Sequence, residues 1–171
     1  MNRIALTQGD VRRKDFRRQY VPVISTLLAC LVTVLPVITA APIVPDFAFL
    51  VLIAWRLLRP EMWSATTALG LGLVNDLIAG HPIGQSMALW TGTFLLMDVI
   101  DSRVVWRDYW MDWLFASLFI LGYSYGDWLI GRFLGSAADF NVLWPQIGAS
   151  ILVYPIIARG VLVLDRWRLT R

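Results

Sequence analysis

An aspartate inside a strongly apolar stretch is the residue of this chain best placed to do chemistry. Asp76 lies within residues 64–92. Small residues recur every four positions around it, at Ser64, Ala68, Gly72 and Gly80. Residues four apart are neighbours on a helix, so these positions predict a groove of small residues with a carboxylate in it. In a membrane, such a groove allows another helix to approach closely. A carboxylate within a transmembrane helix is energetically costly, so its presence there indicates a functional residue.

The turn that follows Asp76 supplies one set of candidate partners for it. Gly80 and Pro82 can end the helix, and the backbone amides of residues 80–84, including Gly84, could satisfy the carboxylate. Arg132 or a donor from another protein are the alternatives. We expect Asp76 to order the turn, with His81 in it, as a surface on which a partner helix docks. The simpler alternative is that Asp76 only ties the third and fifth predicted helices together.

Four further charged residues are predicted to have partners or capping roles. Asp46 follows Pro45 and is a good cap for the helix that begins after it. Arg56 and Asp98 lie at similar depths near the ends of different predicted helices, which favours an ion pair in the inner half of the membrane, or two side chains that reach separately for the headgroups. Arg132 would need a partner such as Asp76 or Asp127.

The sequence offers little for enzymatic or metal chemistry. It contains one histidine and one cysteine, too few for a metal-ligand cluster. A serine does lie between glycines at Gly122, Ser124 and Gly126, but no histidine lies in another predicted span to activate it, so a helix-packing face explains the spacing. No glycine-rich phosphate loop is present. We therefore predict a protein that is not an enzyme and that uses no cofactor and no metal.

The composition is that of a membrane protein. The chain has 171 residues, of which 58% are hydrophobic and 16% charged, whereas a soluble domain is about a quarter charged and under half apolar. A pI of about 9.4 could suggest nucleic acid as a partner. The basic residues are instead scattered over short loops and both ends, as membrane orientation requires, so we expect no nucleic-acid binding.

Six apolar stretches predict an all-α, polytopic fold with six transmembrane helices. Their expected bounds are about 20–41, 47–58, 62–79, 83–100, 110–134 and 142–164. A basic segment, 1–19, precedes this domain of residues 20–165, and a basic tail, 166–171, follows it. With both termini in the cytoplasm, every one of the 15 lysines and arginines except Arg132 lies on the inner side. This asymmetry predicts a multi-pass protein of the bacterial inner membrane.

Two local patterns and the overall plan are typical of one family. Pro45 and Asp46 open the second predicted span, and Trp55 and Pro60 mark its inner end. The segment GLVNDLIAG at 72–80, followed by Ile-Gly at 83–84, is similar to a Gly-x-x-x-Asp-x-x-x-Gly-x-x-x-Gly pattern. In these features and in its small, basic, multi-span plan, the chain resembles the MreD family of bacterial rod shape-determining membrane proteins over about residues 20–165.

The resemblance implies a non-enzymatic scaffold of the cell-elongation (rod) complex, embedded among membrane lipids. Such proteins associate with MreC, a bitopic partner, and through it with the MreB filament, a RodA-type glycosyltransferase and a class B penicillin-binding protein of peptidoglycan synthesis. The family also resembles the six-helix substrate-binding subunits of vitamin importers, so a small-molecule-binding subunit is the alternative. An importer subunit should enclose a cavity with converging polar groups. A scaffold should instead offer a groove for a partner helix, and the scarcity of polar residues favours it.

Overall fold

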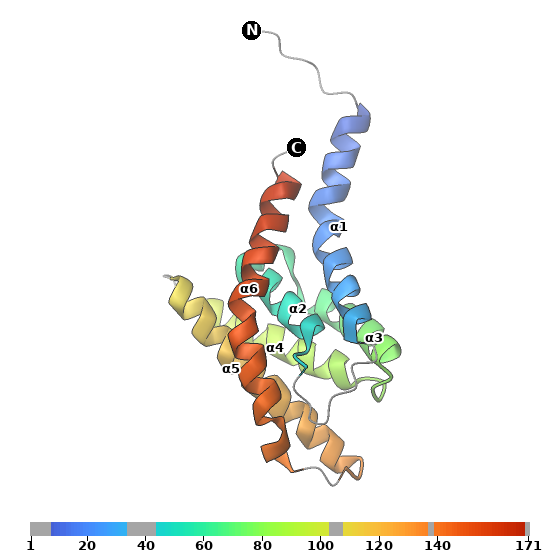
Figure 1. Cartoon of the computed structure of the whole chain (residues 1–171). Coiled ribbons are helices and arrows are strands. Elements are labelled where there is room, and N and C mark those ends of the chain that lie inside the picture. Colours follow the sequence, from blue (N-terminus) through green and yellow to red (C-terminus); the bar gives the residue numbers. More distant parts are fainter. Residues whose placement is uncertain (1–7, 34–43, 103–107, 137–138, 170–171) are drawn as a thin grey trace.

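The computed structural model describes residues 8–33, 44–102, 108–136 and 139–169, and every regular element in these ranges is helical (Figure 1). The elements are α1 (Gln8–Thr33), α2 (Phe47–Leu58), η1 (Pro60–Met62), α3 (Ala65–Ala79), α4 (Gln85–Asp101), α5 (Tyr109–Phe133), η2 (Phe140–Leu143) and α6 (Trp144–Leu169). The predicted all-α class is therefore confirmed for the described part of the chain. The two 3-10 helices, η1 and η2, are single short turns.

The helices begin and end close to the predicted bounds, except at the two ends of the chain. α1 starts at Gln8, inside the segment predicted as a separate basic stretch, and α6 continues to Leu169, through most of the predicted tail. Arginine, lysine and glutamine are good helix formers, so α1 and α6 can continue into the basic segments where the hydropathy of the sequence falls. Residues 34–41 of the first predicted span lie outside the described residues.

Two helical stretches are long and apolar enough to cross a membrane, Tyr109–Phe133 and Phe140–Leu169. Three further apolar stretches, Tyr20–Val32, Phe47–Leu58 and Ala65–Ala79, are shorter. At ~1.5 Å per residue, even the 15 residues of α3 reach only about 23 Å, less than the ~30 Å of hydrocarbon. Helix length therefore identifies two span-length helices, fewer than the predicted six.

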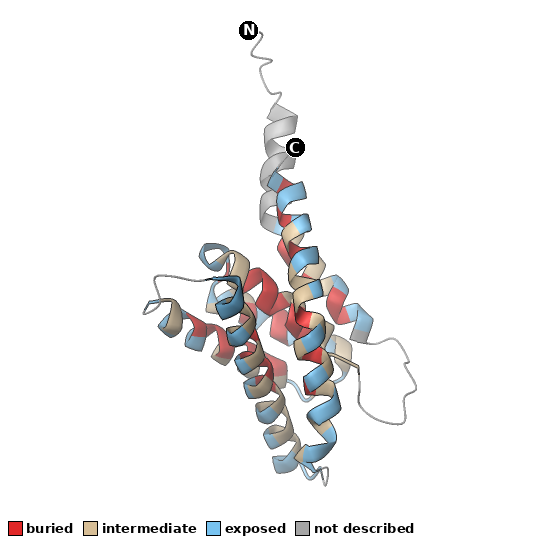
Figure 2. Cartoon of the chain, turned by 60° about the vertical axis from the view of Figure 1, so that its left-hand side comes forward, coloured by how far each residue is buried: buried red, intermediate tan, exposed pale blue. Residues whose placement is uncertain are grey.

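The short helix α2 is the centre of the bundle. It contacts α1, α5 and α6, and its side chains Phe49, Leu52, Ile53 and Trp55 are at most 1% exposed. Figure 2 shows the buried residues concentrated where these helices meet, and the projecting ends of α5 and α6 partly buried or exposed. Because other helices cover it on most sides, α2 does not have to match the membrane thickness by itself.

The two span-length helices, α5 and α6, are joined by a hydrogen bond that replaces one lost at a proline. Pro155 lies inside α6 and has no N–H, so the carbonyl of Ile151, four residues earlier, loses its usual helical donor. The indole Nε1 of Trp113, on α5, donates to this carbonyl at 3.2 Å. At the far end of the pair, Phe140 packs edge-on against Tyr125 and Trp128.

The start of α1 and the end of α6 lie together at the opposite end of the molecule (Figure 1).

The most extensive helix pair is α3 with α4, and its close approach depends on Gly72. A Cβ added at this position would lie 2.6 Å from Cα and 2.8 Å from the backbone nitrogen of Met87, on the first turn of α4. The predicted groove of small residues is therefore occupied within the chain itself. The turn between the helices uses left-handed backbone at Gly80 (φ 72°) and Gly84 (φ 101°), where other residues would be strained.

We predict that Gly72→Ala destabilises the protein by about 1–3 kcal/mol, because the new methyl group must push α4 away. Gly70→Ala is the matched control, since a Cβ there meets nothing within 4 Å on the same helix. The control should be neutral or up to about 1 kcal/mol more stable, from helix propensity alone. Unfolding of the purified protein in detergent compares the two variants. Equal stability of both would contradict the close packing of α3 on α4.

Candidate functional site

Asp76 caps the first turn of α4 from the neighbouring helix. Its Oδ2 accepts hydrogen bonds from the backbone N–H of Gly84 at 2.9 Å and of Met87 at 3.4 Å, and its Oδ1 accepts from Ser86 at 2.8 Å. The first amides of any helix have no partner within that helix, and a negative charge is favourable there. Asp76 is only 1% exposed, so these amides compensate a carboxylate that is removed from solvent.

Two neighbours of Asp76 extend the contact and fix the turn. The side-chain amide of Asn75 donates to Oγ of Ser86 at 3.0 Å, and Nδ1 of His81 lies 3.4 Å from the same oxygen. The backbone N–H of His81 donates to the carbonyl of Asp76 at 3.1 Å. Backbone N–H groups at its start and its end thus hold the turn, and His81 lies within it with a partly exposed side chain.

A polar pocket of about 230 Å³ opens beside this turn. It is lined by Val44, Pro45, Asp46, His81, Tyr123, Asp127 and Gln146. Asp46 caps α2 through a hydrogen bond from the N–H of Phe49 at 3.1 Å, as predicted from its position, and also accepts from the hydroxyl of Tyr123 at 2.7 Å. Asp127 accepts from the side-chain amide of Gln85, at the start of α4. The polar pocket therefore joins α2, α5 and the α3–α4 turn.

The polar pocket is rich in hydrogen-bond acceptors and favours a ligand that donates. Its volume is below the 300–1,000 Å³ usual for small-molecule sites, and it is open at the surface rather than enclosed. Among the described residues, no group of three His, Cys, Asp or Glu side chains is arranged to hold a metal ion. The pocket has the size to take one or two donating side chains of another protein.

Arg132 does not take part in this site. The partners of Asp76 are backbone amides and that of Asp127 is Gln85, whereas the guanidinium of Arg132 lies over the ring of Trp128, 5.3 Å from its centre. The expected ion pair of Arg132 with one of these acids is therefore wrong. Five residues separate Arg132 from Asp127 on α5, which places them on different faces of the helix.

Arg56 is buried at the other end of α2 between two acids. Its guanidinium forms a salt bridge with Asp98, as the sequence suggested, and a second one with Asp101 at 2.9 Å between Nη1 and Oδ2. It also lies 5.7 Å from the ring centre of Phe94. Arg56 is only 2% exposed. The end of α4 is thus tied to the end of α2. The second acid was not predicted, because Asp101 lies just beyond the predicted end of this helix at residue 100.

A second ionic cluster, at the ends of α2 and α6, was not predicted. Asp165 accepts from Nη2 of Arg59 at 2.8 Å and from Nε of Arg168 at 2.7 Å. The hydrogen bonds that Arg59 donates to Asp165 raise the pKa of Arg59 above its ordinary value, so Arg59 stays charged. The spacing of Asp165 and Arg168, three residues apart on one helix, could have indicated their contact. No such signal links Arg59 to a residue 106 positions away.

We predict that Asp76→Asn lowers the stability of the protein by about 1.5–3 kcal/mol, because an amide offers one acceptor oxygen and turns an NH₂ group toward backbone donors. Asp108→Asn is the control, since Asp108 precedes α5 without a side-chain capping bond. Thermal unfolding in detergent measures both. A loss for Asp76→Asn no greater than that for the control would show that the contact contributes nothing to folding.

Comparison with known proteins gives one match, to a protein family. No curated protein and no solved structure matches the chain, so the likeness to vitamin-importer subunits has no support. A family model described as rod shape-determining protein MreD matches residues 14–164. This range includes α2 to α5 completely and most of α1 and α6. The chain therefore belongs to the MreD family, a family of membrane proteins that determine rod shape.

Proposed function

We propose that this MreD-family chain is a non-enzymatic scaffold of the rod system in the bacterial inner membrane. It binds an MreC-like bitopic protein. Through that partner it joins an MreB filament, a RodA-type glycosyltransferase and a class B penicillin-binding protein to peptidoglycan synthesis. The chain crosses the membrane several times, with both termini in the cytoplasm. Family membership supports the role in cell shape, and the partner and topology are our inference.

The arrangement of the chain ends supports this topology. The start of α1 and the end of α6 lie at the same end of the molecule (Figure 1), as an even number of crossings requires. The ionic clusters around Arg56 and Asp165 lie at the ends of α2, α4 and α6. The polar pocket lies at the start of α2, beside the α3–α4 turn. Positive-inside orientation makes the end with the arginines cytoplasmic and leaves the polar pocket on the outer side.

The single observation that carries the docking proposal is a rigid turn next to an open, acceptor-rich pocket. Asp76 fixes the turn before any partner arrives, so binding does not have to order it. Asp46 and Asp127 give the polar pocket a negative character. A donating or cationic side chain from the outer part of the partner fits this charge, and charge complementarity of this kind favours specificity.

We predict that the double variant His81→Ala/Gln146→Ala loses the MreC-like partner while keeping its own stability. Both side chains line the polar pocket. We expect retention to fall by about tenfold, the effect of one lost hydrogen bond to a charged group. Co-purification of the two full-length proteins from membranes measures it.

Asn141→Ala is the matched control, an exposed amide residue in η2 outside the pocket lining. Expression level and thermal unfolding of each variant verify that the fold is intact. If the double variant has normal stability and still retains the partner normally, the polar pocket is not part of the interface.

A further inference from the structure

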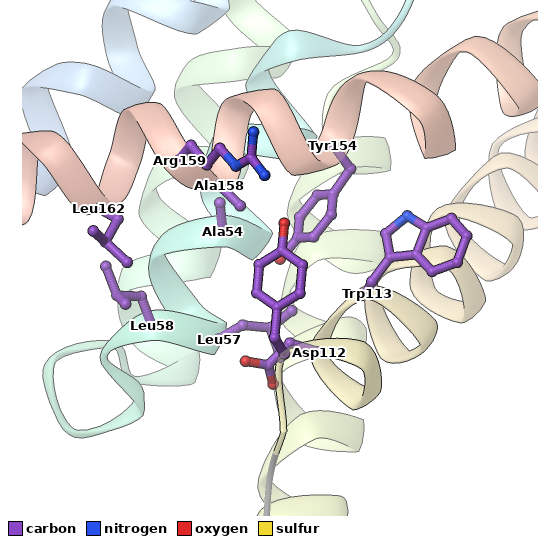
Figure 3. A pocket seen from close by; sticks show the side chains of 10 residues that line it. Ala54, Leu57, Leu58, Asp112, Trp113, Tyr154, Ala158, Arg159 and Leu162 are labelled. Carbon is purple, nitrogen blue, oxygen red and sulfur yellow. The ribbon is translucent and has the colours of Figure 1, made fainter.

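A second pocket lies at the side of the bundle, where α2 ends and α5 begins. This lateral pocket has a volume of about 100 Å³. It is lined by Ala54, Leu57, Leu58, Tyr109, Asp112, Trp113, Tyr154, Ala158, Arg159 and Leu162. Its walls come from α2, α5 and α6 (Figure 3). Its floor is mostly aliphatic, and its charged groups stand on two sides, Arg159 on α6 and Asp112 on α5.

Arg159 differs from the other arginines of the described core. Arg56, Arg59 and Arg168 each contact an aspartate at less than 3 Å. Arg159 is exposed, and no acid of the described ranges lies within salt-bridge distance of it. A cation on an apolar helix in a membrane is costly without a counter-ion. The charge of Arg159 therefore calls for an anion from outside the chain.

The lateral pocket lies at the level expected for lipid headgroups. It sits beside Leu58, the last residue of α2, and Tyr109, the first of α5. Arg159 is six residues, or about 9 Å, along α6 from the ionic cluster at Asp165. Next to the pocket, Tyr109 is 55% and Trp110 73% exposed. Exposed tyrosine and tryptophan are enriched at the membrane–water interface, and an arginine side chain is long enough to reach that level.

We propose that the lateral pocket binds the headgroup of a membrane phospholipid, with the phosphate held by Arg159. Arginine matches the geometry of a phosphate with two parallel hydrogen bonds. The first acyl carbons lie along Leu57, Leu58 and Leu162. The pocket is too small and too local for a partner helix, which needs an extended groove along several turns.

The opposite rim of the pocket specifies the type of headgroup. Asp112 places a carboxylate across the opening from Arg159 (Figure 3). A headgroup that joins a phosphate to a primary amine is complementary to both charges, whereas phosphatidylglycerol offers only the phosphate. The bound lipid is therefore phosphatidylethanolamine. This site is independent of the partner interface at the polar pocket and depends only on the membrane location of the chain.

The test uses the full-length protein, purified in detergent and stripped of lipid, with phosphatidylethanolamine that carries a photoreactive acyl chain. Crosslinks in the wild type should map to the α2 and α6 residues that line the lateral pocket. Unlabelled phosphatidylethanolamine should compete better than phosphatidylglycerol. Arg159→Gln should weaken binding by about tenfold, the effect of a lost charge-assisted hydrogen bond.

Two variants make the outcome decisive. Arg132→Gln removes an exposed arginine at the far end of α5 and should leave the pocket crosslinks unchanged. Arg159→Lys keeps the charge but cannot make the two parallel hydrogen bonds, so its binding should lie between that of the wild type and that of Arg159→Gln. Thermal unfolding of both variants at the wild-type temperature shows that the loss of binding is not a folding defect. Equal crosslinking of wild type and Arg159→Gln overturns the proposal. So does full competition by inorganic phosphate, which would make it a free-anion site, or crosslinking only to a co-purified polypeptide.

Discussion

The carboxylate of Asp76 on the first amides of α4 is the contact on which the arrangement of α3, α4 and the turn between them depends. It replaces the local cap that α4 lacks, because its own N-cap residue is Gly84, without a side chain. The bond lengths of 2.8 and 2.9 Å to Ser86 and Gly84 require the two helices to lie very close. Gly72 makes that approach possible by having no Cβ. The aspartate and the glycine therefore act as one unit, and neither is explained without the other.

Much of the fold could be predicted from the sequence because hydropathy and turn residues act locally. The helix order, the turn at Gly80 to Gly84 and the cap at Asp46 follow from patterns within a few residues of each other. The ends of the chain were harder, since α1 and α6 continue through charged residues that favour helix as much as apolar ones do. The burial of α2 could not be predicted from the sequence either. Its cover by other helices on most sides is a tertiary property.

For the candidate site, the sequence predicted the important residues better than it predicted which residues contact each other. Sequence spacing singled out Asp76 and offered the amides of residues 80–84 among three options. In the structure one of these, the amide of Gly84, donates to Asp76, together with the amides of Ser86 and Met87 on α4. Sequence spacing could not show that the hydroxyl of Tyr123 donates to Asp46, since 77 positions separate the two residues. The pairing of Arg132 with an acid failed because helix phase, rather than charge count, decides which side chains meet. Contacts between distant segments depend on packing that no local pattern encodes.

Hydrogen exchange of individual backbone amides in the full-length protein, without any partner, tests the central claim most directly. The account holds that Asp76 fixes the start of α4 in the free protein. The amides of Gly84 and Ser86 should then exchange as slowly as the buried core of α2, while the amide of the exposed neighbour Ile83 exchanges fast. Fast exchange at Gly84 and Ser86, equal to that at Ile83, would mean that the cap is not formed and that the turn is not a preformed surface.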